Sequence, residues 1–227
     1  MRSSHLADRM KKAYLGIDVG SITNNMVLLD EENRIIAKQY LRTYGQPLNS
    51  LQIGLKELHR ATAGTYVVAG VGTTGSGRHL ASILVGADVV KNEITSHAMA
   101  ALNYEPAVRT IIEIGGQDSK VIFLREQVIT EFNMNTICAA GTGSFLDQQA
   151  FRLGTPIEEF GLYALRAKKP ASIAGRCTVF AESDMIHKQQ MGYSKEDIIA
   201  GLCEALVRNY MNNLVKNRTL PEPILFQ

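Results

Sequence analysis

A short pattern occurs twice in the chain and limits the folds it can adopt. Residues 15–21 (LGIDVGS) and 111–117 (IIEIGGQ) are each an apolar run with an acidic residue two positions before a glycine. A second apolar run follows each of them, over 25–30 and 119–124. Apolar runs joined at glycine predict β-hairpins, and a repeated unit of this kind predicts a duplicated architecture. We therefore expect an α/β chain whose two halves open in the same way.

The rest of the pattern places strands early in each half and helices after Gly143. A serine at 194 followed by an aspartate at 197 fits a capping box, which marks the start of a long helix. Expected strands cover 14–19, 25–30, 34–41, 66–71, 110–114, 119–124, 127–132 and 221–226, and expected helices cover 48–63, 95–102, 144–153, 156–165, 183–191 and 194–215.

Composition excludes several classes of protein. The chain has 24 basic and 22 acidic side chains, a formal net charge of +2, and no dense basic stripe of the kind that binds nucleic acid. No apolar run approaches the roughly 20 residues that span a bilayer, and the polar N-terminus has no signal-peptide core. The three cysteines form no CxxC pair. We therefore expect a cytoplasmic protein with no nucleic-acid or membrane partner.

The first glycine turn is a candidate phosphate-binding loop. Its backbone N–H groups can converge on phosphate oxygens, glycine permits close approach, and an acid can hold Mg²⁺. An ordinary hairpin with glycine at a positive φ explains this turn equally well. The candidate residues are Asp18, Gly20, Ser21 and Thr23.

The second turn repeats the arrangement and favours nucleotide binding. Two such hairpins that face each other across a cleft can clamp ATP. The candidate residues are Gly115, Gly116, Ser119 and Lys120 for binding, and Glu113, Gln117 and Asp118 for catalysis. Gln117 and Asp118 are candidates to orient the attacking water, and Asp18 and Glu113 to act through Mg²⁺ or its waters. The glycine-rich stretch 70–78 lacks the lysine of a P-loop and predicts a flexible strand-to-helix connection.

Two cysteines stand in loops shortly before predicted helices. Cys138 precedes Gly141, Thr142 and Gly143, whose N–H groups at a helix start favour a thiolate or an anionic cofactor. Cys177 stands in a similar loop beside a cation. Without further information, small buried hydrophobic residues are the simpler interpretation of both. Cys203, at helical spacing among apolar residues, belongs with that interpretation.

Four strings resemble one protein family. They are residues 15–21, 113–120 (EIGGQDSK), 138–146 (CAAGTGSFL) and 175–183 (GRCTVFAES). The chain is similar, over about residues 13–227, to the activators of 2-hydroxyacyl-CoA dehydratases, grouped with the benzoyl-CoA reductase ATPase subunits as BadF/BadG/BcrA/BcrD-type ATPases. The two cysteine strings are the specific part of this resemblance.

The resemblance implies a duplicated actin/Hsp70/sugar-kinase-like (ribonuclease H-like) fold with mixed sheets flanked by helices. It also implies that Cys138 and Cys177 bind one [4Fe-4S] cluster shared across a homodimer. ATP hydrolysis, with Mg²⁺ and with ADP as product, would drive one electron from the cluster to a partner. The implied donor is reduced ferredoxin or flavodoxin. The implied acceptor is a dehydratase, an aromatic acyl-CoA reductase or a double-cubane cluster protein.

The same resemblance suggests a division of the chain. We expect residues 1–12 to be a disordered leader, 13–103 an N-terminal ribonuclease H-like lobe, and 104–227 a second lobe that carries the cluster-ligand loops and is truncated at its C-terminus. Members of the family continue into a glycine-rich adenosine-binding loop and a final helix. Two alternatives stay open, a sugar kinase of the same fold and a nucleotide-dependent regulatory module, neither of which uses the cysteines for redox chemistry.

Overall fold

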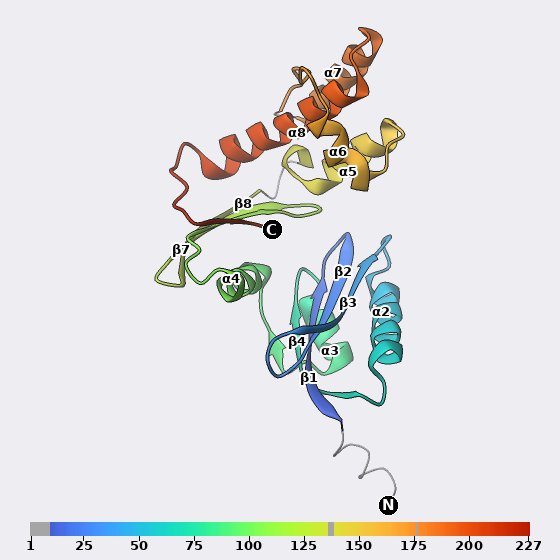
Figure 1. The fold of residues 1–227 in the computed structure, drawn as a ribbon, viewed down its shortest axis with the longest axis vertical. Coiled ribbons are helices and arrows are strands. Elements are labelled where there is room, and N and C mark those ends of the chain that lie inside the picture. Colours follow the sequence, from blue (N-terminus) through green and yellow to red (C-terminus); the bar gives the residue numbers. More distant parts are fainter. Residues whose placement is uncertain (1–9, 136–138, 176) are drawn as a thin grey trace, which may run out of the picture. The chain divides into compact units, whose positions relative to one another are not determined.

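A computed structural model describes residues 10–135, 139–175 and 177–227. It divides into two compact units, Met1–Met99 and Ala100–Gln227, and helix α4 (Glu93–Tyr104) crosses the boundary between them. Each unit is built around one mixed β-sheet with helices beside it (Figure 1).

The first unit contains a five-stranded sheet in the order β3-β2-β1-β4-β5. The first three strands form an antiparallel meander, and β4 and β5 continue the sheet in parallel with β1. Two helices, α2 and α3, pack against this sheet. The bounds are β1 (Lys11–Val19), β2 (Thr23–Leu29), β3 (Ile35–Arg42), α2 (Pro47–Thr62), β4 (Tyr66–Thr74), α3 (Arg78–Val85) and β5 (Val89–Val90).

Alternation along β1 builds the core of this unit. Every second residue of the strand is buried, so that Leu15 and Ile17 share one face of the sheet. Helix α2 contributes Leu51 and Leu58 to the same cluster, and α3 contributes Ala81. The face of β1 that is buried against these helices ends at the first candidate turn.

The second unit contains a four-stranded sheet in the order β8-β7-β6-β9. The strands are β6 (Thr110–Ile114), β7 (Ser119–Arg125), β8 (Val128–Asn135) and β9 (Ile224–Phe226). Strands β6, β7 and β8 form an antiparallel meander and β9 runs parallel to β6, as β4 does to β1. Glu113 on β6 lies opposite Lys120 on β7. At the equivalent position of the first unit, Asp18 on β1 lies opposite Asn25 on β2. The predicted repeat is therefore confirmed as two equivalent hairpins.

Helices make up the rest of the second unit. Helix α8 contacts both α6 and α7, and α5 contacts α6, around a core that includes Phe145, Met185 and Leu202. The Ser194 hydroxyl accepts a hydrogen bond from the Asp197 N–H at 3.1 Å, as the capping pattern predicted. The bounds are α5 (Gly143–Arg152), α6 (Ile157–Leu165), α7 (Thr178–Gln190) and α8 (Lys195–Tyr210), with a 3₁₀ turn η1 (Ala139–Gly141) and a π-helical turn η2 (Met211–Val215).

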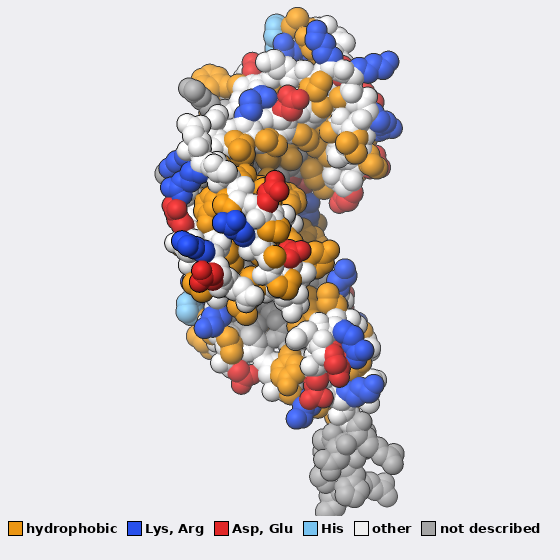
Figure 2. All heavy atoms as spheres, turned by 60° about the vertical axis from the view of Figure 1, so that its left-hand side comes forward, with side chains coloured by type: hydrophobic (Ala, Val, Ile, Leu, Met, Phe, Trp, Pro, Cys, Tyr) orange, Lys and Arg blue, Asp and Glu red, His pale blue; other side chains and the backbone are white. Residues whose placement is uncertain are grey.

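The two largest shifts in helix boundaries from the sequence prediction are at the start of α7 and the end of α8. Helix α7 begins at Thr178, before the predicted start at Ser183. The Ser183 hydroxyl donates to the Val179 carbonyl from within the helix. The helix predicted over 194–215 changes at Tyr210 into the π-helical turn, which ends at Lys216 with a left-handed φ of 53°. None of the described helices is long and apolar enough to cross a membrane. In Figure 2, basic and acidic side chains are interspersed over the visible face.

Candidate phosphate-binding turns and cysteine loop

The first turn is a tight connection between β1 and β2. The Gly20 N–H donates to the Thr23 carbonyl at 2.9 Å. A Cβ at Gly20 would lie 2.9 Å from that same oxygen, so only glycine fits here without a shift. Asp18 accepts a hydrogen bond from the Asn25 amide at 3.3 Å, and Ser21 is exposed at the tip. The turn therefore combines an acid with an exposed hydroxyl.

The glycine-rich stretch 70–78 packs directly against this turn. Its Gly77 N–H donates to the Val19 carbonyl at 2.8 Å. Gly75 has a φ of 84°, and a side chain there would overlap the Asp18 carboxylate. The stretch is less of a connection than predicted, because its residues up to Thr74 belong to β4 and α3 begins at Arg78, which leaves 75–77 between the two elements. The position of this stretch against Asp18 was not predicted from the sequence, although its glycine density is a signal of close backbone approach.

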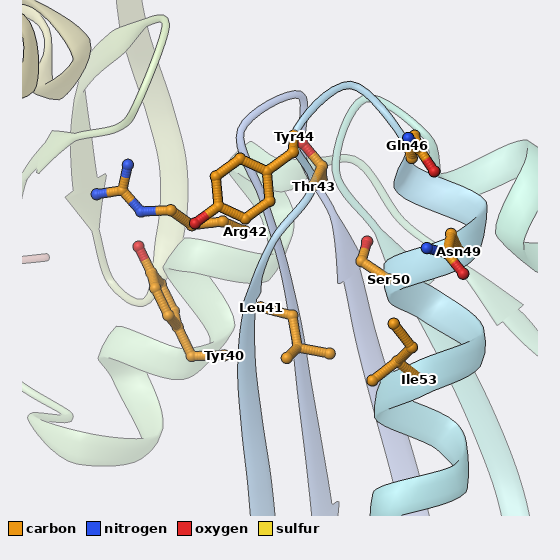
Figure 3. A pocket seen from close by; sticks show the side chains of 9 residues that line it. All are labelled: Tyr40, Leu41, Arg42, Thr43, Tyr44, Gln46, Asn49, Ser50 and Ile53. Carbon is orange, nitrogen blue, oxygen red and sulfur yellow. The ribbon is translucent and has the colours of Figure 1, made fainter.

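A groove of about 480 Å³ lies where β3 meets α2. Tyr40, Arg42 and Tyr44 project to one side of the strand, and Asn49, Ser50 and Ile53 line the helix side (Figure 3). One residue that lines the groove is hydrogen-bonded to the first turn: the Thr43 hydroxyl donates to the Ser21 carbonyl at 2.8 Å. Asn24, after the turn, donates to the Ser50 hydroxyl at 2.6 Å. This groove was not predicted from the sequence.

The second turn is closed by a buried ion pair. The Gly115 N–H donates to the Asp118 carbonyl at 2.9 Å. The Lys120 ammonium contacts Glu113 at 3.1 Å and Asp118 at 2.5 Å. The side chains of Lys120 and Glu113 are 4% and 8% exposed, and that of Asp118 is 38% exposed. Gln117 is exposed. Glu113 is thus held inside by the lysine, while Asp118 and Gln117 reach solvent.

The charge of Lys120 is stabilised despite its burial. Burial by itself lowers the pKa of a lysine, but the hydrogen bond to Asp118 and the charge of Glu113 outweigh it, so that the pKa of Lys120 is raised. Lys120 is therefore a cation that neutralises part of the negative charge at this turn.

The segment 141–144 is hydrogen-bonded to the second turn. The Gly143 N–H donates to the Gly115 carbonyl at 2.8 Å, and the Ser144 N–H donates to the Gly116 carbonyl at 2.9 Å. The Ser119 hydroxyl donates to the Gly141 carbonyl at 2.6 Å, and Thr142 is the buried N-cap residue of α5. The structure thus brings the second set of predicted phosphate residues together with Gly141, Thr142 and Gly143. The Gly143 N–H already has a carbonyl partner.

Of the two predicted cluster ligands, the structure describes Cys177. This residue is the N-cap of α7, with extended backbone, a partly exposed side chain and no side-chain capping hydrogen bond. Its loop is fixed by the Ala174 N–H, which donates to Asp184 at 2.8 Å. Cys138 lies outside the described residues. Over the described ranges, no group of three His, Cys, Asp or Glu side chains is placed to hold a metal ion.

The fit of Cys177 to an iron–sulfur cluster rests on its chemistry and place. Cluster ligands are cysteine sulfurs, and Cys177 is a partly exposed cysteine at the N-terminal end of α7. Cys203, in contrast, packs against the helical core, and burial raises the pKa of its thiol. The structure therefore separates a partly exposed cysteine at a helix end from a packed one.

Residues 15–227 match the BadF/BadG/BcrA/BcrD ATPase family. The chain belongs to this family. The resemblance inferred from the four sequence strings is thereby confirmed, and the described fold agrees with its duplicated actin- and sugar-kinase-like architecture. Membership identifies the chain as an ATPase-family protein.

Relatives within the family include activators of CoA-ester enzymes. The chain is 38% identical to the (R)-2-hydroxyglutaryl-CoA dehydratase activating ATPase of Acidaminococcus fermentans, over 83% of this chain and 72% of that protein. It is also 38% identical to the activator of lactoyl-CoA dehydratase of Anaerotignum propionicum, over 83% of this chain and 72% of that protein. A component of the benzoyl-CoA reductase of Thauera aromatica is 32% identical, over 48% of this chain and 39% of that protein.

A solved structure agrees with the description of the fold. The activator of 2-hydroxyisocaproyl-CoA dehydratase from Clostridium difficile, with bound ADPNP, matches 94% of this chain and 79% of that one. The TM-score is 0.86 at 31% identity.

Proposed function

We propose that this chain is an ATP-hydrolysing activator that delivers single electrons to a CoA-ester enzyme. The observation that carries the proposal is the pair of equivalent hairpins, each with an acid two residues before a turn glycine, in a chain that matches an ADPNP-bound activator. The two turns bind the phosphates of ATP, which is hydrolysed with water to ADP and phosphate.

The two acids that occupy equivalent positions have different roles in this proposal. Asp18 lies opposite the neutral Asn25, which suits it to hold Mg²⁺, directly or through water. Glu113 is buried and ion-paired with Lys120, which suits it to position the lysine and Asp118. Asp118, which is 38% exposed, and the exposed Gln117 orient the attacking water.

The cysteines are the ligands of one [4Fe-4S] cluster in this proposal. Such clusters take four thiolates, which Cys138 and Cys177 from each half of a homodimer supply. Beside Cys177, α7 presents Val179 and Phe180, whose side chains are 66% and 65% exposed. Exposed apolar side chains next to a ligand support a dimer interface there. When bound, the cluster supplies one-electron transfer.

The partners follow from the relatives and the chemistry. A reduced ferredoxin or flavodoxin is oxidised by one electron, and the acceptor is reduced by one. The named relatives favour a 2-hydroxyacyl-CoA dehydratase or an aromatic acyl-CoA reductase as acceptor, and a double-cubane cluster protein would use the same donor. A sugar kinase of this fold is the second candidate from the sequence, but it gives no role to the cysteine strings.

Metal analysis of cysteine variants tests the proposal. Iron, acid-labile sulfide and the visible spectrum are measured on anaerobically purified protein. We expect about four irons per dimer, lost in Cys138→Ser and in Cys177→Ser, with Cys203→Ser as the matched control that keeps them. Asp118→Asn should keep the iron and lose ATP hydrolysis. An intact anaerobic dimer without iron would instead favour the kinase.

A further inference from the structure

The last turn of α8 holds the backbone just before Cys177. Asn209 is 2% exposed, and its side-chain amide donates to the Gly175 carbonyl at 2.6 Å. Arg208 donates to the Ile173 carbonyl at 2.6 Å. A Cβ at Gly175 would lie 2.8 Å from the Ala205 carbonyl, so this loop packs on the helix backbone itself. The cysteine loop therefore follows any displacement of this end of α8.

The next residue of α8 holds the second phosphate turn. The Tyr210 hydroxyl donates to the Lys120 carbonyl at 2.6 Å, and the residue is 3% exposed. Burial, with the charge of Glu113 nearby, raises the pKa of Tyr210, so the hydroxyl keeps its proton and stays a donor. Consecutive residues of one helix thus contact the cysteine loop and the strand that carries the turn.

A second route joins Asn209 to the same turn. The Ser119 hydroxyl donates to the Gly141 carbonyl, and a Cβ at Gly141 would lie 2.6 Å from the Asn209 side-chain oxygen. That oxygen also accepts a hydrogen bond from the Asn213 amide at 3.0 Å, within the π-helical turn. Asn209 is therefore in contact with the segment that follows Cys138 and bonded to the one that precedes Cys177.

We propose that Asn209 is a positioning residue that couples the nucleotide state of the second turn to the loop of Cys177. The inference rests on the proposed function, because it assumes that the turn binds nucleotide phosphates. Close packing transmits displacement, since Gly141 and Gly175 have no space to absorb it. Irregular helical turns such as η2 occur often at functional sites. The coupling is an energetic link between two sites through one residue in contact with both.

The test uses the full-length chain with Cys138→Ser and Cys203→Ser, in which Cys177 is the one remaining thiol. The alkylation rate of Cys177 by N-ethylmaleimide is measured with and without Mg²⁺ and ADPNP, and ADPNP affinity is measured by calorimetry. We expect nucleotide to change the rate by about fivefold or more in this parent, and by less than about twofold once Asn209→Ala is added at unchanged ADPNP affinity.

Two further variants complete the design. Asn212→Ala removes an exposed asparagine from the same π-helical turn and should retain the full change in rate. Tyr210→Phe removes only the hydroxyl that bonds to Lys120, and should reduce the nucleotide-dependent change in the alkylation rate. If Asn209→Ala fails to fold, Asn209→Ser replaces it under the same criteria.

The outcomes separate the two proposals. An unchanged nucleotide effect in the Asn209 variant overturns the role of Asn209, as does a parent that binds ADPNP without any effect on Cys177. A parent that does not bind ADPNP overturns the proposed function and the coupling with it.

Discussion

Replacing Lys120 with methionine should destabilise the second unit by removing the cation from a buried ion pair. The side chains of Lys120 and Glu113 are 4% and 8% exposed and their charges lie 3.1 Å apart. Breaking a buried pair by removing one partner costs about 3–5 kcal/mol, because the other charge stays buried without compensation. Asp118 is 38% exposed, so water screens its interaction with Lys120 and this second contact adds little to the loss. We therefore expect a loss of about 3 kcal/mol in the free energy of unfolding at pH 7.

Urea unfolding followed by far-UV circular dichroism measures this loss. With a dependence of about 2 kcal/mol per molar urea, the midpoint should fall by about 1.5 M. The double variant Glu113→Gln/Lys120→Met removes the uncompensated charge and should recover more than about half of the loss. A single variant that loses less than about 1 kcal/mol, or a double variant no more stable than the single one, would show that Glu113 is not left as an uncompensated buried charge.

The pH dependence gives an independent check on the ion pair. The pKa of Lys120 is raised in the folded protein. Its contribution to stability is therefore fully present below the ordinary lysine pKa and is lost as pH rises through the raised value. The free energy of unfolding of the wild type should therefore approach that of Lys120→Met in strong alkali.

Three substitutions outside the turns test the packing of the helices, each by the free energy of unfolding in urea. Ser194→Ala removes the cap bond to Asp197 and should cost about 1 kcal/mol. Gly201→Ala places a methyl group that would overlap the Ala171 carbonyl, and should cost about 1–3 kcal/mol. Gly161→Ala, in the middle of α6 with open space at its Cβ position, should stabilise by up to about 1 kcal/mol.

The last two substitutions control for each other, because both add one methyl group to a helical glycine. Equal effects at Gly201 and Gly161 would contradict the steric argument. An unchanged stability in Ser194→Ala would show that the cap bond contributes nothing to α8.

Local chemistry made the hairpins predictable. The acid, the apolar alternation and the turn glycine of residues 15–21 and 111–117 stand within a few positions of one another, and glycine is required where Gly20 meets Thr23. The strand over 110–114 was predicted with its observed bounds. The start of α7 was missed because its N-cap residue, Cys177, is not a typical capping residue and makes no side-chain capping hydrogen bond.

Contacts between distant residues were not accessible from the pattern. The glycine density of 70–78 signals close approach but does not show that Gly75, with a φ of 84°, lies against Asp18. In the sequence, Asn209 is simply one polar residue of an amphipathic helix. Asn209 is hydrogen-bonded to Gly175 and contacts Gly141, and both partners are far from it along the chain. The spacing of neighbouring residues cannot predict such contacts.

The sequence by itself determined the duplicated hairpin architecture and the family, because strand alternation, turn glycines and the cysteine strings are short-range features. The folded structure was needed to show that Glu113 is buried against Lys120 while Asp118 reaches solvent, and that α8 is bonded both to Lys120 beside the second turn and to the cysteine loop. The physical reason is that burial and ion pairing depend on which distant segments pack together, and packing is a property of the whole fold.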